Sequence, residues 1–176
     1  LFELCLPWLH ERAFKLIQEA NRLNKWGFDL NPKNIHIRVA EYHEYEVGGT
    51  LSNIKHIDVG SLVTIDIMLE EACSGGYFQT MNNNTNNTNN INTNTSNINP
   101  NDTNNNITNS NSNNIITKHP FHAGNAIVFV SHKYHHVSAL EKGSRKVIII
   151  EYWNGKKRKC GHRCEKRYGK CDFVDE

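Results

Sequence analysis

The sequence contains no run of 18 apolar residues, so we expect no membrane-spanning helix. Its cysteines are few, odd in number and unevenly spaced, which is not typical of the disulfide framework of a small secreted domain. We therefore favour an intracellular location, cytoplasmic or nuclear. The chain begins with Leu1 and not with methionine, and we expect that its natural N-terminus is missing.

A strong net charge is also lacking, because the formal value is only +2 at neutral pH. The positive charge is local: residues 156–171 contain eight Lys or Arg and one Glu. We expect residues 156–176 to form a solvated basic tail that contacts acidic partners. The alternative is a zinc site, although its first three ligands would be closer in sequence than is usual. Its ligands would be Cys160, His162, Cys164 and Cys171.

One segment has almost nothing that can be buried. Of the 33 residues from 82 to 114, 19 are Asn, six are Thr, three are Ser and only three are Ile. Such a composition cannot offset the entropy that is lost when a chain becomes ordered. We predict an Asn/Thr-rich disordered insertion over residues 82–117, and the tip of a hairpin is where such a length is best tolerated.

The remaining residues predict one helix followed by strands. Apolar residues recur at helical spacing before Lys25, and Gly27 provides a stop signal. These residues are Leu9, Ala13, Phe14, Leu16, Ile17, Ala20 and Leu23. From residue 35 the pattern changes to alternation, and seven or eight short strands follow. We predict a mainly β fold with flanking α structure, a sandwich or jelly roll over residues 36–155, with residues 1–35 as a helical buttress.

Two short motifs carry the candidate chemistry. His56 and Asp58 would project from the same face of a strand and bind one metal ion from one side. His135 lies in a later histidine-rich segment, and a hairpin would bring Arg145 beside its strand. Two histidines and one carboxylate are the ligand set of non-haem Fe(II) oxygenases, and an arginine suits the distal carboxylate of a 2-oxo acid. The alternatives are a surface pair at His56 and Asp58, and a solvated turn residue at Arg145.

In this order, these motifs resemble the double-stranded β-helix 2-oxoglutarate/Fe(II) oxygenases, in particular the prolyl 4-hydroxylase-like branch. Residues 74–78 ("SGGYF") are similar to the Gly-Gly strand of that branch. Residues 118–137 are similar to its P..GDA..F.S...H.V segment, with Asn125 where Asp is usual. The resemblance covers roughly residues 36–154 without the insertion.

The resemblance implies a role for each candidate residue. His56, Asp58 and His135 would be the catalytic iron ligands, with His135 preferred to His136 because it fits the H-x-V spacing. Arg145 would bind 2-oxoglutarate. Tyr45 would contact the same co-substrate or belong to the core. Thr64 would supply an oxygen, since Met68 stands where the family often has a tyrosine, and His132 would lie near the pocket mouth.

The implied reaction is hydroxylation of a C–H bond with 2-oxoglutarate and O₂, releasing succinate and CO₂. The resemblance points to a protein or peptide substrate with a prolyl residue as the site of hydroxylation, and to ascorbate as a reductant. Two alternatives remain at this point. One is a catalytically silent jelly-roll binding module. The other is an oxygenase acting on nucleic acid or a small molecule, although the second arginine of nucleic-acid demethylases is absent after Arg145.

Overall fold

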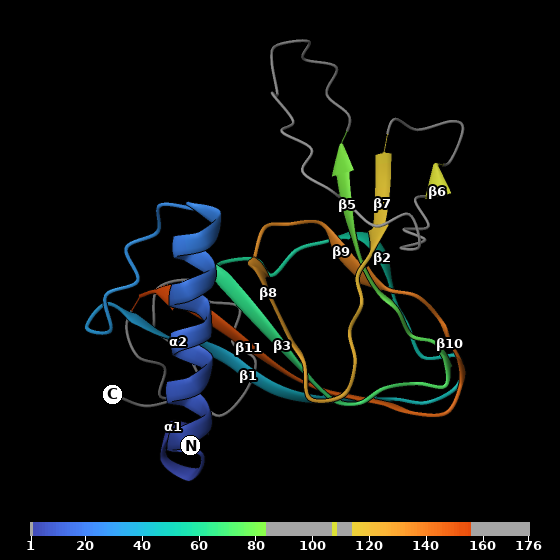
Figure 1. Ribbon diagram of the computed structural model, residues 1–176, viewed down its shortest axis with the longest axis horizontal. Helices are drawn as coiled ribbons and strands as arrows, with labels where there is room; N and C mark the ends of the chain where they lie inside the picture. Colours follow the sequence, from blue (N-terminus) through green and yellow to red (C-terminus); the bar gives the residue numbers. More distant parts are fainter. Residues whose placement is uncertain (1, 84–106, 109–113, 156–176) are drawn as a thin grey trace, which may run out of the picture.

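The computed structural model describes residues 2–83, 107–108 and 114–155. It consists of two helices and three antiparallel sheets (Figure 1). The helices are α1 (Phe2–Cys5) and α2 (Pro7–Asn24). The strands are β1 (Ile35–Tyr45), β2 (Leu51–His56), β3 (Val63–Glu70), β4 (Ser74–Gly75), β5 (Phe78–Asn83), β6 (Ile107–Thr108), β7 (Asn114–Lys118), β8 (Ala126–Val130), β9 (His135–Val137), β10 (Leu140–Lys142) and β11 (Arg145–Asn154). The prediction of a mainly β fold with an N-terminal helix is confirmed.

The strands divide into one four-stranded, one five-stranded and one two-stranded sheet. The orders are β1-β11-β3-β8, β2-β9-β5-β7-β6 and β10-β4, respectively. Side chains from the first two sheets meet in one apolar cluster, in which Met68 and Val147 come from the four-stranded sheet and Phe78 and Val137 from the five-stranded sheet. These two sheets therefore face each other across a shared interior.

The N-terminal helix packs on the four-stranded sheet and not between the sheets (Figure 1). Ala13 and Ile17 are its buried residues, and they join a core cluster with β3 and β11. Leu16 and Leu23 are exposed, so the buried stripe is narrower than the sequence predicts. The helix ends as expected, with Lys25 in the left-handed conformation at φ 53°. Within the described residues, no helix is long and apolar enough to cross a membrane.

The two faces of strand β3 have different partners. Val63 and Ile65 pack towards the helix, in the same cluster as Ala13 and Ile17. Because side chains alternate along a strand, Thr64 and Asp66 project from the opposite face, towards the five-stranded sheet. Residues from Val63 to Met68 are buried or half-buried on both faces, and strands of this kind are usually apolar throughout. The polar residues on its inner face are therefore exceptions that need partners.

The boundaries predicted for the disordered insertion differ from the structure. Strand β5 extends to Asn83, and Asn114–Lys118 forms β7, which pairs with β5 in antiparallel register. Residues 114–117 include Ile115 and Ile116, and branched side chains favour strands over disorder. Residues 107 and 108 form the short strand β6. The rest of the predicted insertion, residues 84–106 and 109–113, lies outside the described residues.

Candidate active site

His56 and Asp58 are neighbours, but a strand does not hold them as predicted. Strand β2 ends at His56, and Asp58 lies in the connection to β3. The backbone N–H of Asp58 donates a hydrogen bond to the carbonyl of Ser131, at 2.9 Å. This bond fixes the connection so that His56 Nε2 lies 3.2 Å from Asp58 Oδ1. The two side chains thus converge through a turn and not through strand alternation.

The third candidate ligand, His135, comes from strand β9. It lies opposite His56 in the register of β2 and β9, and its Nε2 is 3.6 Å from Asp58 Oδ1. One ligand atom from each of His56, Asp58 and His135 lies within 4.8 Å of the other two. The distance between these side chains is therefore short enough for them to share one metal ion.

The surroundings of His135 prepare it as a ligand. Its Nδ1 lies 2.9 Å from the carbonyl oxygen of Lys133, so the Nδ1–H donates and the lone pair of the neutral ring is on Nε2. Burial lowers the pKa of His135 below its usual range, which favours this neutral form. Phe78 and Phe129 pack against the ring, with centroids at 5.8 and 4.8 Å. The imidazole is thereby fixed in orientation.

The other two histidines of the segment lie elsewhere. His136 is buried, but it projects from the opposite face of β9 and does not join the cluster of potential ligands. His132 is exposed. The structure therefore brings His135, and neither of its neighbours, to His56 and Asp58.

Thr64 has a different position from the one expected of a co-substrate contact. It is completely buried, and its Oγ1 donates a hydrogen bond to Asp58 Oδ2 at 2.6 Å. The Oγ of Ser131 lies 2.9 Å from Thr64 Oγ1 and donates to it. Burial raises the pKa of Asp58, but the hydrogen bonds from His56 and Thr64, with an electrostatic contribution from His135, outweigh it, and the pKa lies below its ordinary value. Thr64 thus orients a candidate ligand, and it does not line the pocket.

Arg145 is the first residue of β11, and its side chain lines the same pocket as the three candidate ligands. The residue is only 1% exposed, and its Nε and both terminal nitrogens have no hydrogen-bond partner. Burial lowers the pKa of Arg145, but a guanidinium stays charged in proteins. A buried charge without a partner costs several kcal/mol, roughly, and a bidentate carboxylate would satisfy it.

Tyr45 lies beside Arg145 and forms part of the pocket wall. The two residues are opposite each other in the register of β1 and β11, and the guanidinium carbon is 5.1 Å from the centre of the Tyr45 ring. Phe121 contacts the guanidinium from further away, at 5.9 Å. Burial raises the pKa of Tyr45, which keeps its hydroxyl neutral. The ring therefore both supports the cation and borders the space beside it.

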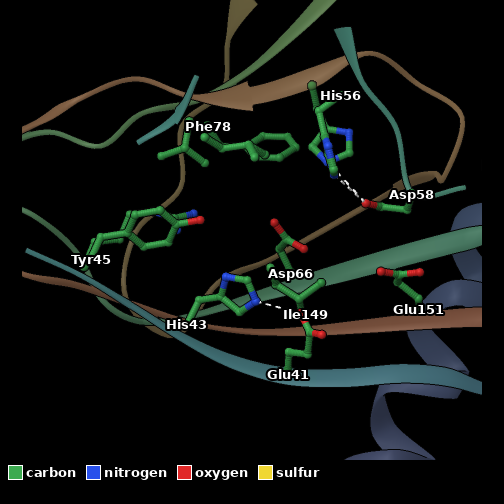
Figure 2. A pocket seen from close by; sticks show the side chains of 13 residues that line it. Glu41, His43, Tyr45, His56, Asp58, Asp66, Phe78, Ile149 and Glu151 are labelled. Atoms are coloured by element: carbon green, nitrogen blue, oxygen red, sulfur yellow. Dashed lines mark hydrogen bonds and ion pairs between the residues drawn. The ribbon is translucent and has the colours of Figure 1, made fainter. Parts of the chain in front are cut away.

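Sequence reasoning missed other polar residues of the pocket. Figure 2 shows Asp66 among the side chains that line it, together with Glu41, His43 and Glu151. Glu151 has partners, since Arg38 and Ser61 donate hydrogen bonds to its carboxylate at 2.9 and 2.6 Å. The signal for Asp66 was present: it is a single carboxylate in the middle of the apolar run of β3.

The candidate zinc ligands and the basic tail cannot be compared with the structure. Cys160, His162, Cys164 and Cys171 all lie outside the described residues, as does the whole of segment 156–176. Both remain predictions. In the described part of the chain, Cys5 and Cys73 are free and exposed.

Neither a protein-family model nor a curated protein matches this chain. Among solved structures, it is similar to a chain described as an oxidoreductase of the 2OG-Fe(II) oxygenase family from Burkholderia pseudomallei, with 14% identity and a TM-score of 0.46. The match covers 77% of this chain and 50% of the other, so this chain spans about half the length of that protein. Because the identity and the TM-score are this low, a function can be argued only from the residues of the site.

Proposed function

We propose that this chain is a 2-oxoglutarate- and Fe(II)-dependent oxygenase that hydroxylates a C–H bond. One observation carries the proposal: a group of two histidines and one aspartate and an unpartnered, buried arginine line the same pocket. The two histidines and the aspartate suit a divalent metal ion, and the arginine suits a carboxylate. A small molecule that contacts both must be an acid that also coordinates a metal.

The donor set fits Fe(II). His56, Asp58 and His135 offer two imidazoles and one carboxylate, and this set leaves positions on the metal for other ligands. In the neutral tautomer of His135 the lone pair is on Nε2, the nitrogen on the side of Asp58, where it is available to a metal ion held between the two residues. The residues that would hold iron are therefore these three.

The pocket also fits 2-oxoglutarate. The three unpartnered nitrogens of Arg145 are hydrogen-bond donors that only an acceptor entering the pocket would satisfy. A carboxylate matches the planar guanidinium and accepts two bonds. Arg145 would bind the distal carboxylate, while the oxo acid end would face the metal ligands.

When bound, iron, 2-oxoglutarate and O₂ supply the oxidation of the C–H bond, with succinate and CO₂ as products. The chain contributes positioning and a dry environment. Thr64 and Ser131 hold Asp58, and the carbonyl of Lys133 orients His135. Apolar side chains complete the wall and exclude water from the pocket; they are Leu51, Phe78, Val137 and Ile149.

The family branch, the substrate and the reductant are proposed from the motif resemblance. We propose that the two facing sheets form a double-stranded β-helix of the prolyl 4-hydroxylase-like branch. The substrate is then a protein or peptide, with a prolyl residue as the site of hydroxylation. Ascorbate would act as the reductant that maintains Fe(II).

The test is the release of succinate from 2-oxoglutarate by the protein with Fe(II), measured against a panel of proline-containing peptides. The parent protein should release succinate, and His56→Ala should not. His122→Ala is the matched control, because His122 is an exposed histidine that does not line the pocket, and it should behave like the parent. Absence of turnover in the parent with every peptide would favour a silent binding module. Equal turnover in His56→Ala and the parent would contradict the assignment of His56 as a metal ligand.

A further inference from the structure

The proposed function leaves one buried acid in the pocket without a role. Asp66 is 5% exposed, lines the pocket with Arg145 and the three candidate metal ligands, and its Oδ1 has no hydrogen-bond partner. Figure 2 shows its carboxyl group directed into the space between the surrounding side chains. A buried carboxyl without a partner is costly, and its presence on an apolar strand indicates a ligand that compensates for it.

The register of the strands gives the position of Asp66 relative to the two ends of the pocket. Thr64, Asp66 and Met68 follow one another on the inner face of β3. Thr64 is at the metal end, because it bonds to Asp58. Met68 is at the other end, because it pairs with Val147 of β11, two positions after Arg145. Asp66 therefore lies between the metal ligands and the guanidinium, along the path of an acid held by both.

Burial favours the uncharged form of Asp66. Asp58 and Glu151 line the same pocket, so an ionised Asp66 would be repelled by both carboxylates. Arg145 would favour ionisation, but it does not hydrogen-bond to Asp66. Burial outweighs this attraction to Arg145, and with the two carboxylates it raises the pKa of Asp66 to about 8. A neutral carboxyl group has one O–H donor. Met68, which lies on the same face of β3, has no hydrogen-bond donor in its side chain.

We propose that Asp66, as the uncharged acid, donates a hydrogen bond to a carboxylate oxygen of bound 2-oxoglutarate and so sets the affinity of the pocket for this co-substrate. The inference rests on the proposed function. An O–H bond to a carboxylate is charge-assisted, and such bonds are stronger than those between neutral groups. An ionised Asp66 would have the opposite effect, because it would repel the dicarboxylate.

Two variants of Asp66 separate these cases. Asp66→Asn keeps a neutral hydrogen-bond donor, and Asp66→Leu removes the donor while keeping a similar size. The measurement is the dissociation constant of 2-oxoglutarate for the Mn(II)-loaded protein at pH 7, by calorimetry. Asp66→Asn should bind within about threefold of the parent, whereas Asp66→Leu should bind about tenfold more weakly or worse.

The opposite results overturn the inference. If Asp66 is ionised, both variants lose a repulsive charge and bind 2-oxoglutarate more tightly than the parent. Equal binding by Asp66→Leu and the parent would show that no hydrogen bond is made. Should Asp66→Leu not fold, as judged by circular dichroism, the Asn variant still decides, because binding more than about threefold tighter than the parent contradicts a neutral donor.

Failure of the proposed function has a different signature. In that case the parent itself does not bind 2-oxoglutarate, and Arg145→Met changes nothing, so the inference about Asp66 falls with it. If the parent binds 2-oxoglutarate and Arg145→Met does not, the assignment of the pocket to the co-substrate is supported. The comparison of the two Asp66 variants then tests the inference by itself.

Discussion

The Nε2 atom of His135 lies 3.6 Å from Oδ1 of Asp58, although the two residues are far apart in the sequence. The pairing of β2 with β9 brings His135 opposite His56, and the turn after β2 directs Asp58 towards both. Two neighbouring strands of the five-stranded sheet and the connection that leaves β2 therefore bring the three residues together.

Loss of a ligand should abolish tight metal binding. Asp58→Asn and His56→Ala each remove a donor from the group, and Mn(II) affinity should fall by at least about 100-fold. Electron paramagnetic resonance of added Mn(II) measures the free ion directly. His122→Ala, at an exposed histidine that does not line the pocket, should leave the affinity unchanged. A normal affinity in Asp58→Asn would exclude this carboxylate as a ligand.

Thr64 should affect metal binding through Asp58. Thr64→Val removes the hydroxyl that bonds to Asp58 Oδ2 while keeping the shape of the side chain. We expect metal affinity to fall by about 10- to 100-fold, as is usual when the partner of a ligand is lost. Thr64→Ser keeps the hydroxyl and should restore most of the affinity. Equal effects of the Val and Ser variants would point to packing and not to this hydrogen bond.

Removal of the buried guanidinium should stabilise the protein and remove its response to the co-substrate. In the absence of ligand, Arg145→Met replaces an unpartnered buried charge by an apolar chain, so the free energy of unfolding should rise by about 1–4 kcal/mol. Addition of 2-oxoglutarate should raise the melting temperature of the parent but not of the variant. A less stable Arg145→Met that still responds would contradict the assignment.

Asp66 should make stability depend on pH. Its pKa is raised from 3.8 to about 8, so between these values the folded chain holds a proton that the unfolded chain has lost. The stabilising effect of this proton is complete below the unfolded value and is lost as pH rises through the folded value. Stability should therefore decrease between about pH 4 and pH 8, by an amount on the order of a few kcal/mol.

The control for this pH dependence is Asp66→Asn, which cannot titrate at this position. Urea unfolding of the parent and the variant at several pH values gives the two profiles. The variant should show a flatter profile over this range. Parallel profiles would mean that the carboxyl of Asp66 has an ordinary pKa in the folded chain.

The sequence was informative where one physical signal dominated. Helical spacing and Gly27 predicted the helix that ends at Asn24, and alternation predicted a mainly β chain. The proximity of His56, Asp58 and His135 could be predicted because the first two are close in sequence and His135 fits the H-x-V motif of the family that the sequence resembles. The turn that joins His56 to Asp58 could not be predicted, because it depends on a hydrogen bond to Ser131 on a distant segment.

Roles that depend on packing were beyond sequence reasoning. Thr64 was expected in the pocket, but its bond to Asp58 depends on where β3 lies relative to the end of β2. Asp66 was overlooked because the inner and outer faces of a strand buried on both sides look alike in sequence. Strand β7 was missed, because Asn-rich flanks concealed the two isoleucines that pair with β5 and their segment was assigned to the insertion.

The most direct test of the account is an anaerobic titration of the Fe(II)-loaded protein with 2-oxoglutarate, observed by visible absorption. Chelation of Fe(II) by a 2-oxo acid gives a weak charge-transfer band. We predict a saturable band in the parent, its loss in His56→Ala, and a much weaker affinity in Arg145→Met. A parent protein that binds Fe(II) but develops no band at any concentration of 2-oxoglutarate would contradict the account.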